Sequence, residues 1–125
     1  MKVAYKVVSV HVNNGIEHYL SSRIYGTDWI LEYKIGEWTF PIVQSSRLFV
    51  FDSLEHAQMF AMKSEKIFSC HVISPRPAKF MCSFVIDFPK FWKGRKKGIR
   101  GFARDGTLFC KGVRLLQQQP NLSIV

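Results

Sequence analysis

A β-hairpin signal at the amino terminus limits the fold of this chain more than any other feature. Residues 3–12 are dense in β-branched side chains that alternate between two faces, which favours a strand covered on part of both sides. Asn13-Asn14-Gly15 follows, and Asn-Gly supplies the positive φ values that a tight hairpin turn requires. We therefore predict a return strand from Ile16 to about Ile24, paired antiparallel with the first.

Shorter strand patterns continue along the chain, separated by turns and prolines. They are predicted at residues 29–34, 38–40, 47–51, 67–73, 79–86 and 107–116. One helix is predicted at about residues 53–64, where small and apolar side chains recur at helical spacing. Asp52 and Glu55 have the spacing of a capping box, with Asp52 as the N-cap.

These elements together predict an α+β fold. We expect a twisted, mostly antiparallel sheet of about six to eight short strands, with the one main helix packed on it. The 125 residues make a single domain, 1–125, in which residues 117–125 form a frayed tail. The strands are apolar on both faces, so the long loops or a second copy of the chain must cover the second face. We expect a homo-oligomer, a dimer or larger.

The cysteines and the amino terminus bear on the compartment. Cys70, Cys82 and Cys110 are odd in number, lack Cys-x-x-Cys spacing and lie in apolar segments, which favours buried free thiols and a reducing compartment. The amino terminus lacks the pattern of a signal peptide, and no apolar run approaches the length of a membrane span. We expect a soluble, cytoplasmic protein that binds no membrane.

The strongest functional signal is the basic stretch, residues 88–104. It holds seven of the chain's 18 Lys and Arg residues and no carboxylate, so the net charge of +9 falls to +2 without it. Aromatic residues and three glycines are interleaved with the cations. Cations among flat rings on a flexible backbone suit a phosphate joined to a base. The basicity is local, as expected for a phosphate-bearing partner.

Two groups of residues are candidates for this binding. The predicted phosphate ligands are Arg95, Lys96, Lys97, Arg100 and Arg104, with Arg23 as a weaker candidate. The predicted base-stacking residues are Phe80, Phe88 and Trp92. Two alternatives stay open: the stretch is a solvated loop, or its rings pack inward and anchor the loop to the core.

Other chemistries find less support in the sequence. Cys70-His71, Cys82 and Cys110 offer metal ligands, but adjacent strand residues point to opposite faces, so we predict no metal site. His11 and His18 could face each other across the first hairpin, an arrangement more often structural than catalytic. No Gly-x-Ser-x-Gly, Walker or dinucleotide-binding pattern is present. We therefore expect no enzymatic activity, no catalytic residues and no cofactor.

Three pieces of the chain resemble a known family. They are Tyr5-Lys6-Val7-Val8, the run Leu48-Phe-Val-Phe-Asp-Ser-Leu-Glu-His-Ala57 continuing to Phe60, and Gly106-Thr-Leu with Val113-x-Leu115. Over most of residues 5–116 this arrangement resembles small phage-encoded anti-defence proteins, of the first-described Thoeris type. The resemblance implies an oligomeric sponge that sequesters cyclic ADP-ribose-type signals or cyclic oligonucleotides without cleaving them. It also implies that the compartment is the cytoplasm of an infected bacterium. No ligand-contacting residue is carried over from the family.

The sequence thus favours non-enzymatic binding and sequestration of a small phosphorylated nucleotide signal. One alternative is a basic nucleic-acid-binding module, in which the same stretch follows a phosphate backbone. The other is a phage inhibitor that presses this stretch against an acidic surface of a host protein.

Overall fold

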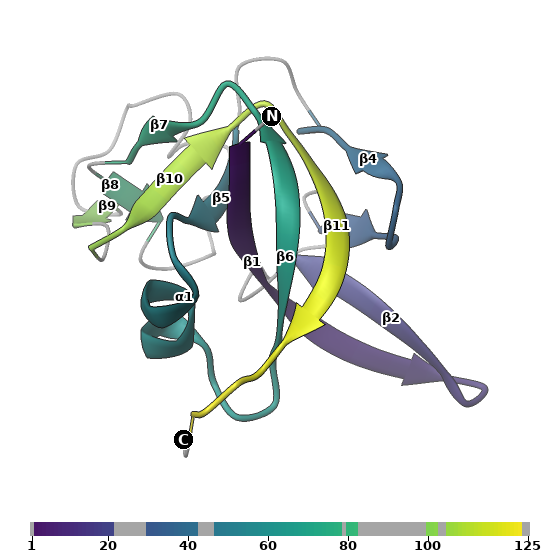
Figure 1. Ribbon diagram of the computed structural model, residues 1–125. Helices are drawn as coiled ribbons and strands as arrows, with labels where there is room; N and C mark the ends of the chain where they lie inside the picture. Colours follow the sequence, from purple (N-terminus) through teal and green to yellow (C-terminus); the bar gives the residue numbers. More distant parts are fainter. Residues whose placement is uncertain are drawn as a thin grey trace.

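The first hairpin forms as predicted in the computed structural model, which describes residues 2–21, 30–42, 47–78, 80–82, 100–102 and 105–123. Strand β1 (Lys2–Asn13) pairs antiparallel with β2 (Ile16–Ser21), and His11 lies opposite His18. Asn14 and Gly15 form the turn with φ of 52° and 76°, the conformation for which Asn-Gly is suited. The end of the hairpin projects from the rest of the sheet (Figure 1).

The main sheet contains nine strands and is antiparallel at every pairing that the structure describes. Its strand order is β4-β11-β6-β1-β5-β10-β7, an open order and not a closed barrel, with β3 attached to β2. The further members are β3 (Glu32–Tyr33), β4 (Trp38–Thr39), β5 (Leu48–Phe51), β6 (Lys66–Ile73), β7 (Arg76–Pro77), β10 (Thr107–Cys110) and β11 (Gly112–Gln119). The predicted class, α+β with a mostly antiparallel sheet, is confirmed. The strand count exceeds the prediction because β7 was not predicted and because the strand predicted at 107–116 is two strands, β10 and β11, separated at Lys111.

The helix is shorter than predicted and has a different cap. Helix α1 (Leu54–Phe60) begins after Ser53, whose φ of −140° is extended and whose hydroxyl accepts a hydrogen bond from the His56 amide at 3.1 Å. The predicted N-cap, Asp52, is therefore wrong: the cap lies one residue later. The helix ends at Ala61, where ψ is 141°, because the chain turns there toward β6.

The carboxyl-terminal segment is more ordered than the predicted frayed tail. Strand β11 continues past an irregularity between Leu115 and Gln117, and its last three glutamines pair with Ile67–Ser69 of β6. Beyond the strand, the Asn121 side chain donates to the carbonyl oxygens of Met62 and Glu65, at 2.9 and 2.8 Å. Residues 117–123 are thus held in place because β6 and the turn after α1 offer them backbone partners. Residues 124–125 lie outside the described part of the chain.

The sheet has a buried cluster on each face. The larger cluster contains side chains from six strands of the main sheet. One of them is Tyr33 of β3, which is only 2% exposed, so the sheet curls around this face. Its members include Ala4, Val8, Leu48, Val50, Phe68, Cys70, Val72, Leu108, Cys110, Val113 and Leu115. The smaller cluster joins α1 to the opposite face through Val7, Phe51, Ala57, Ala61 and Ile67. The small side chains of the two alanines let the helix lie close to the strands.

Two expectations about the compartment can be compared with this fold. Cys70 and Cys110 are free and buried, as predicted, and burial raises the pKa of both thiols, to about 12 and about 11. The Cys82 side chain lies outside the described part of the structure. Within the described ranges, no helix is long and apolar enough to cross a membrane.

Candidate functional site

The basic stretch leaves and rejoins the described fold through a small separate sheet. Strand β8 (Phe80–Cys82) pairs antiparallel with β9 (Arg100–Phe102). Phe80 lies opposite Phe102, Met81 opposite Gly101 and Cys82 opposite Arg100. The two ends of the connecting segment, residues 83–99, therefore meet at this strand pair. The sequence predicted a strand at 79–86, and the described strand covers its first part.

The structure describes only two of the predicted site residues, and only their backbone positions. Phe80 and Arg100 both lie in the β8–β9 sheet, two register positions apart on opposite strands. The remaining candidates, Arg23, Phe88, Trp92, Arg95, Lys96, Lys97 and Arg104, lie outside the described residues. The contacts of these side chains, with a ligand or with the core, stay predictions.

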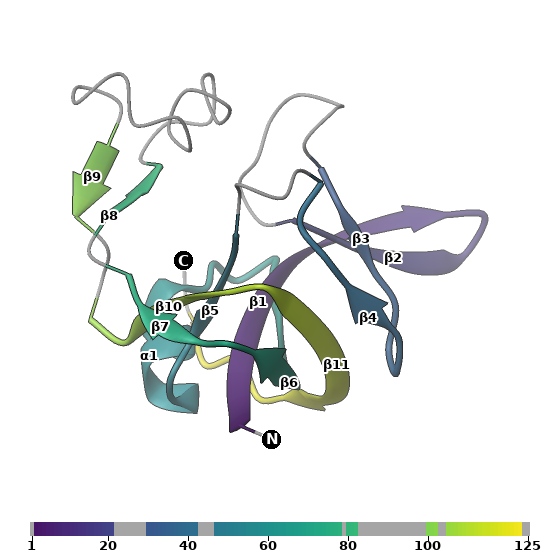
Figure 2. The ribbon, with the colours of Figure 1, turned by 90° about the horizontal axis from the view of Figure 1, so that it is seen from above.

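On both sides of the β8–β9 pair, the chain is attached to the same strand of the main sheet, β10. Strand β7, which precedes β8, pairs with β10, placing Pro77 opposite Leu108. The amide of Ala78 donates to the Thr107 carbonyl oxygen at 2.9 Å. Strand β10 itself follows β9 after the Asp105-Gly106 turn. Figure 2 shows β8 and β9 beyond β7 and β10, at one side of the main sheet.

A second contact fixes this turn to the start of the helix. The Asp52 amide donates to the Gly106 carbonyl oxygen at 2.8 Å, and the Asp52 carboxylate lies 2.6 Å from Nδ1 of His56. Gly106 has φ of +80°, and a Cβ on it would overlap the His56 ring and the Asp52 carboxylate. The hydrogen bond from Asp52 raises the pKa of His56, and the charges of Glu55 and Asp105 add to the effect. The cationic form of His56 is thus favoured at this position.

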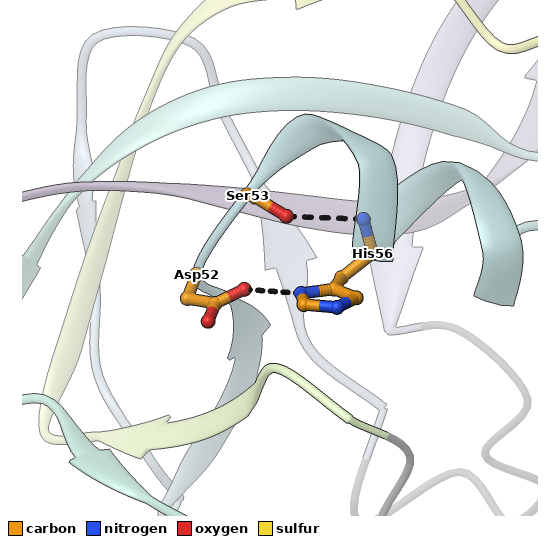
Figure 3. Close-up of polar contacts among 3 residues, drawn as sticks. All are labelled: Asp52, Ser53 and His56. Carbon is orange, nitrogen blue, oxygen red and sulfur yellow. Dashed lines mark hydrogen bonds and ion pairs between the residues drawn. The ribbon is translucent and has the colours of Figure 1, made fainter.

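The Asp52–His56 pair does not form a catalytic triad with Ser53. In a triad the serine hydroxyl meets the imidazole nitrogen opposite the one held by the carboxylate. Here the Ser53 hydroxyl is bonded to the backbone amide of His56, as Figure 3 shows, and caps the helix. The pair instead lies against the Asp105-Gly106 turn, which follows the basic stretch in the chain. Within the described residues, no group of three His, Cys, Asp or Glu side chains could hold a metal ion.

A cluster around one arginine, which the sequence analysis did not single out, lies near the opposite edge of the sheet, where β11 pairs with β4. The Arg114 guanidinium stands over the Trp38 ring, with its carbon 5.1 Å from the ring centroid, and Nη2 lies 2.8 Å from Nδ1 of His71. Its Nε is buried without a hydrogen-bond partner. The sequence does contain a signal for this cluster, because Arg114 stands among the apolar residues of 113–116. It does not identify Trp38 and His71 as the neighbours of Arg114, because strand register alone sets which residues lie opposite it.

A buried lysine was also missed. Lys6 is 7% exposed, its Nζ donates to the Phe49 carbonyl oxygen at 2.7 Å, and it lies 5.0 Å from the centroid of the Tyr33 ring. Burial lowers the pKa of Lys6 to about 8, against small opposing effects of Cys110, Cys70 and Glu65. A lysine with a lowered pKa is a candidate nucleophile when a substrate can reach it. Enclosure in the core and a backbone partner make Lys6 a structural residue instead.

No family model, curated protein or solved structure matches this chain.

Proposed function

We propose that this protein binds a small phosphorylated nucleotide through its basic stretch and sequesters it without cleaving it. The observation that carries the proposal is the pairing of Cys82 with Arg100. This pairing brings together the two ends of the segment 83–99, which contains most of the basic stretch. Five of the stretch's seven cations, Lys90, Lys93, Arg95, Lys96 and Lys97, belong to this closed connection.

Closure matters for affinity because it reduces the entropy that binding must offset. A loop whose ends are held together explores fewer conformations than a tail of the same length, and part of the ordering is complete before the ligand arrives. Arginine forks bind phosphate oxygens two at a time, and aromatic rings stack on bases at about 1–3 kcal/mol each. The stretch contains both residue types within a few positions of one another.

The choice of ligand rests on charge and on the family resemblance. Local positive charge indicates phosphate, and the rings indicate a base attached to it. The anti-defence proteins that the chain resembles sequester cyclic ADP-ribose-type signals and cyclic oligonucleotides. These are therefore the ligands to test first, and in this proposal the protein is a phage-encoded sponge for one of them.

Isothermal titration calorimetry with cyclic ADP-ribose isomers and with cyclic di- and trinucleotides tests the proposal. We expect saturable heat with at least one of them and recovery of the unchanged ligand after denaturation of the complex. If no ligand produces heat, the proposal fails. If the ligand is returned cleaved, the protein is an enzyme and the sequestration part fails.

A nucleic-acid interface is the second candidate, because seven cations within residues 88–104 could neutralise several phosphates at once. Affinity for a nucleic acid falls steeply with salt as counterions are released, whereas a small ligand with one or two phosphates responds weakly. A gel shift with single- and double-stranded DNA and RNA at low and moderate salt separates the two. Binding of long nucleic acids with a steep salt dependence, and none of the cyclic nucleotides, would favour this candidate.

A further inference from the structure

Helix α1 covers only part of the sheet face on which it lies. Val7 and Ile67 pack under the helix, and the two-residue alternation along β1 and β6 puts Val3 and His71 on the same face. Arg114 lies opposite His71 on one side and opposite Trp38 on the other. Side chains of Phe40 and Ile73 lie against Gly112, on this face as well. We call the uncovered set the open surface: Val3, Trp38, Phe40, His71, Ile73 and Arg114.

The open surface has the composition of a protein interface. Val3 is 45% exposed and Phe40 is 54% exposed, and the Phe40 ring is stacked with that of Trp38, their centroids 6.3 Å apart. Tryptophan and arginine are the residues most often responsible for binding energy at interfaces, and aromatic residues in general are enriched there. Figure 1 shows β1, β6 and β11 side by side, with α1 at the lower left, on the β1 side of the three strands.

Arg114 is held in place by its neighbours, and none of the described residues forms an ion pair with it. Its guanidinium is fixed by the Trp38 ring and by His71 Nδ1, so little side-chain entropy remains to be lost on binding. Among the described residues, ion pairs join His18 to Glu32, His56 to Asp52 and Lys66 to Glu17, and Arg114 takes part in none of these. The surface therefore presents one uncompensated positive charge within apolar surroundings. Its complement is a carboxylate among apolar side chains.

The outer side of α1 provides that complement. Ala57 and Ala61 face the sheet, and the opposite side of the helix and the turn after it carry Glu55, Met59 and Met62. Met59 is 66% exposed and Met62 is 44% exposed, and Glu55 is exposed in the first turn. Methionine adapts readily to an irregular apolar surface. One face of the molecule thus has one half with an arginine among aromatic rings and another half with the Glu55 carboxylate near exposed methionines.

The helix also raises one half of this face above the other. A helix with its side chains is about 10–12 Å across, so the half covered by α1 stands higher than the open surface by about that amount. When two such stepped faces meet about a two-fold axis, the raised half of each fills the lowered half of the other. A two-fold interface requires this kind of self-complementarity, in which residue i meets j and j meets i.

We propose that two copies of this chain pair through this face, with the outer side of α1 in each copy packed on the open surface of the other. Arg114 then meets the Glu55 carboxylate of the second copy, and Met59 and Met62 cover the exposed rings and Val3. Each sheet face is covered by two helices, one from its own chain and one from the partner.

Light scattering after size exclusion, together with native mass spectrometry, tests the proposal on the full chain. A dimer has a mass of 29 kDa, twice the 14.5 kDa of the chain. Met59→Glu and Arg114→Glu should each weaken the dimer at least tenfold. Arg76→Glu is the matched control: it makes the same charge change as Arg114→Glu at an exposed position on β7, the far edge of the sheet. It should leave the dimer unchanged.

The double variant Arg114→Glu, Glu55→Arg exchanges the two charges and should recover dimer that Arg114→Glu alone loses. A wild-type monomer at the highest concentration measured overturns the proposal. So does a dimer that resists Met59→Glu, or one that Arg76→Glu weakens equally. Met59 is exposed, so this variant should retain the wild-type melting temperature and remain informative if Arg114→Glu misfolds. Nucleotide binding is measured separately, because the interface residues lie outside the basic stretch.

Discussion

The ammonium of Lys6 donates to the carbonyl oxygen of Phe49 at 2.7 Å, beside the Tyr33 ring of the larger cluster. Strands β1 and β5 share only one register position, Tyr5 opposite Phe51, so the lysine provides a second link where the two backbones diverge. The link places a lysine ammonium in the core, and burial accordingly lowers the pKa of Lys6 from its ordinary value of 10.5 to about 8.

This lowered pKa predicts a pH dependence of stability that Lys6→Met removes. Between about pH 8 and pH 10.5 the folded state releases the Lys6 proton while the unfolded state retains it, so the free energy of unfolding of the wild type rises with pH. The rise attributable to Lys6 is about 3 kcal/mol. Urea unfolding at pH 7.5, 9 and 10.5 should show the wild type gaining stability relative to Lys6→Met. The buried thiols oppose the rise in both proteins, so the difference between the two isolates Lys6. A difference that does not change with pH would contradict the prediction.

Gly106→Ala should be strongly destabilising. The backbone there has φ of +80°, which strains an L-residue, and the added Cβ would overlap the His56 ring and the Asp52 carboxylate. We expect a loss of about 2–4 kcal/mol in urea unfolding. Gly36→Ala is the control: φ is +83°, but no atom lies within 4 Å of the new Cβ, so it should lose about 1 kcal/mol from strain alone. Adding His56→Ala to Gly106→Ala should recover part of the loss. Equal losses at the two glycines would mean that His56 moves aside freely.

Ser53→Ala should lower the free energy of unfolding by about 1 kcal/mol, because Ser53 is the residue that caps α1. Asp52→Ala removes a partly exposed ion pair with His56 and should cost less. Thermal or urea unfolding of the two variants ranks them directly. The reverse order, with Asp52 the more costly, would restore Asp52 as the cap.

Arg100→Ala combined with Arg104→Ala should weaken nucleotide binding about tenfold or more while the melting temperature stays nearly unchanged. The matched control is Lys34→Ala with Lys63→Ala, which also removes two positive charges but at exposed positions outside the basic stretch. Titration calorimetry and a thermal melt on both double variants give the two readouts. Unfolding of the arginine variant would mean that these side chains are structural, and equal weakening by the lysine variant would indicate an effect of net charge alone.

The sequence predicted those features of the fold that local chemistry decides. Asn14-Gly15 specified the first turn and with it the register that places His11 opposite His18. Alternation of side chains located most of the strands. The pattern of Leu54, Ala57 and Ala61 located the helix, though the side chain that caps it was assigned one position too early.

What local chemistry could not decide depends on partners distant in sequence. The last glutamines form strand because β6 lies beside them, and Lys6 is buried because Phe49 and Tyr33 close over it. Likewise, nothing near Arg114 in the sequence indicates that Trp38 and His71 will lie on either side of it.

By itself the sequence determined the hairpins, the class of the fold and the placement of seven positive charges in one stretch, since turn geometry, alternation and charge are properties of neighbouring residues. The tertiary structure alone decided that positions 82 and 100 lie together and which side chains meet on each sheet face. It also decided that Arg114 has no anionic partner among the residues that the structure describes. These follow from strand order and register across the sheet, which bring together residues that no local pattern relates.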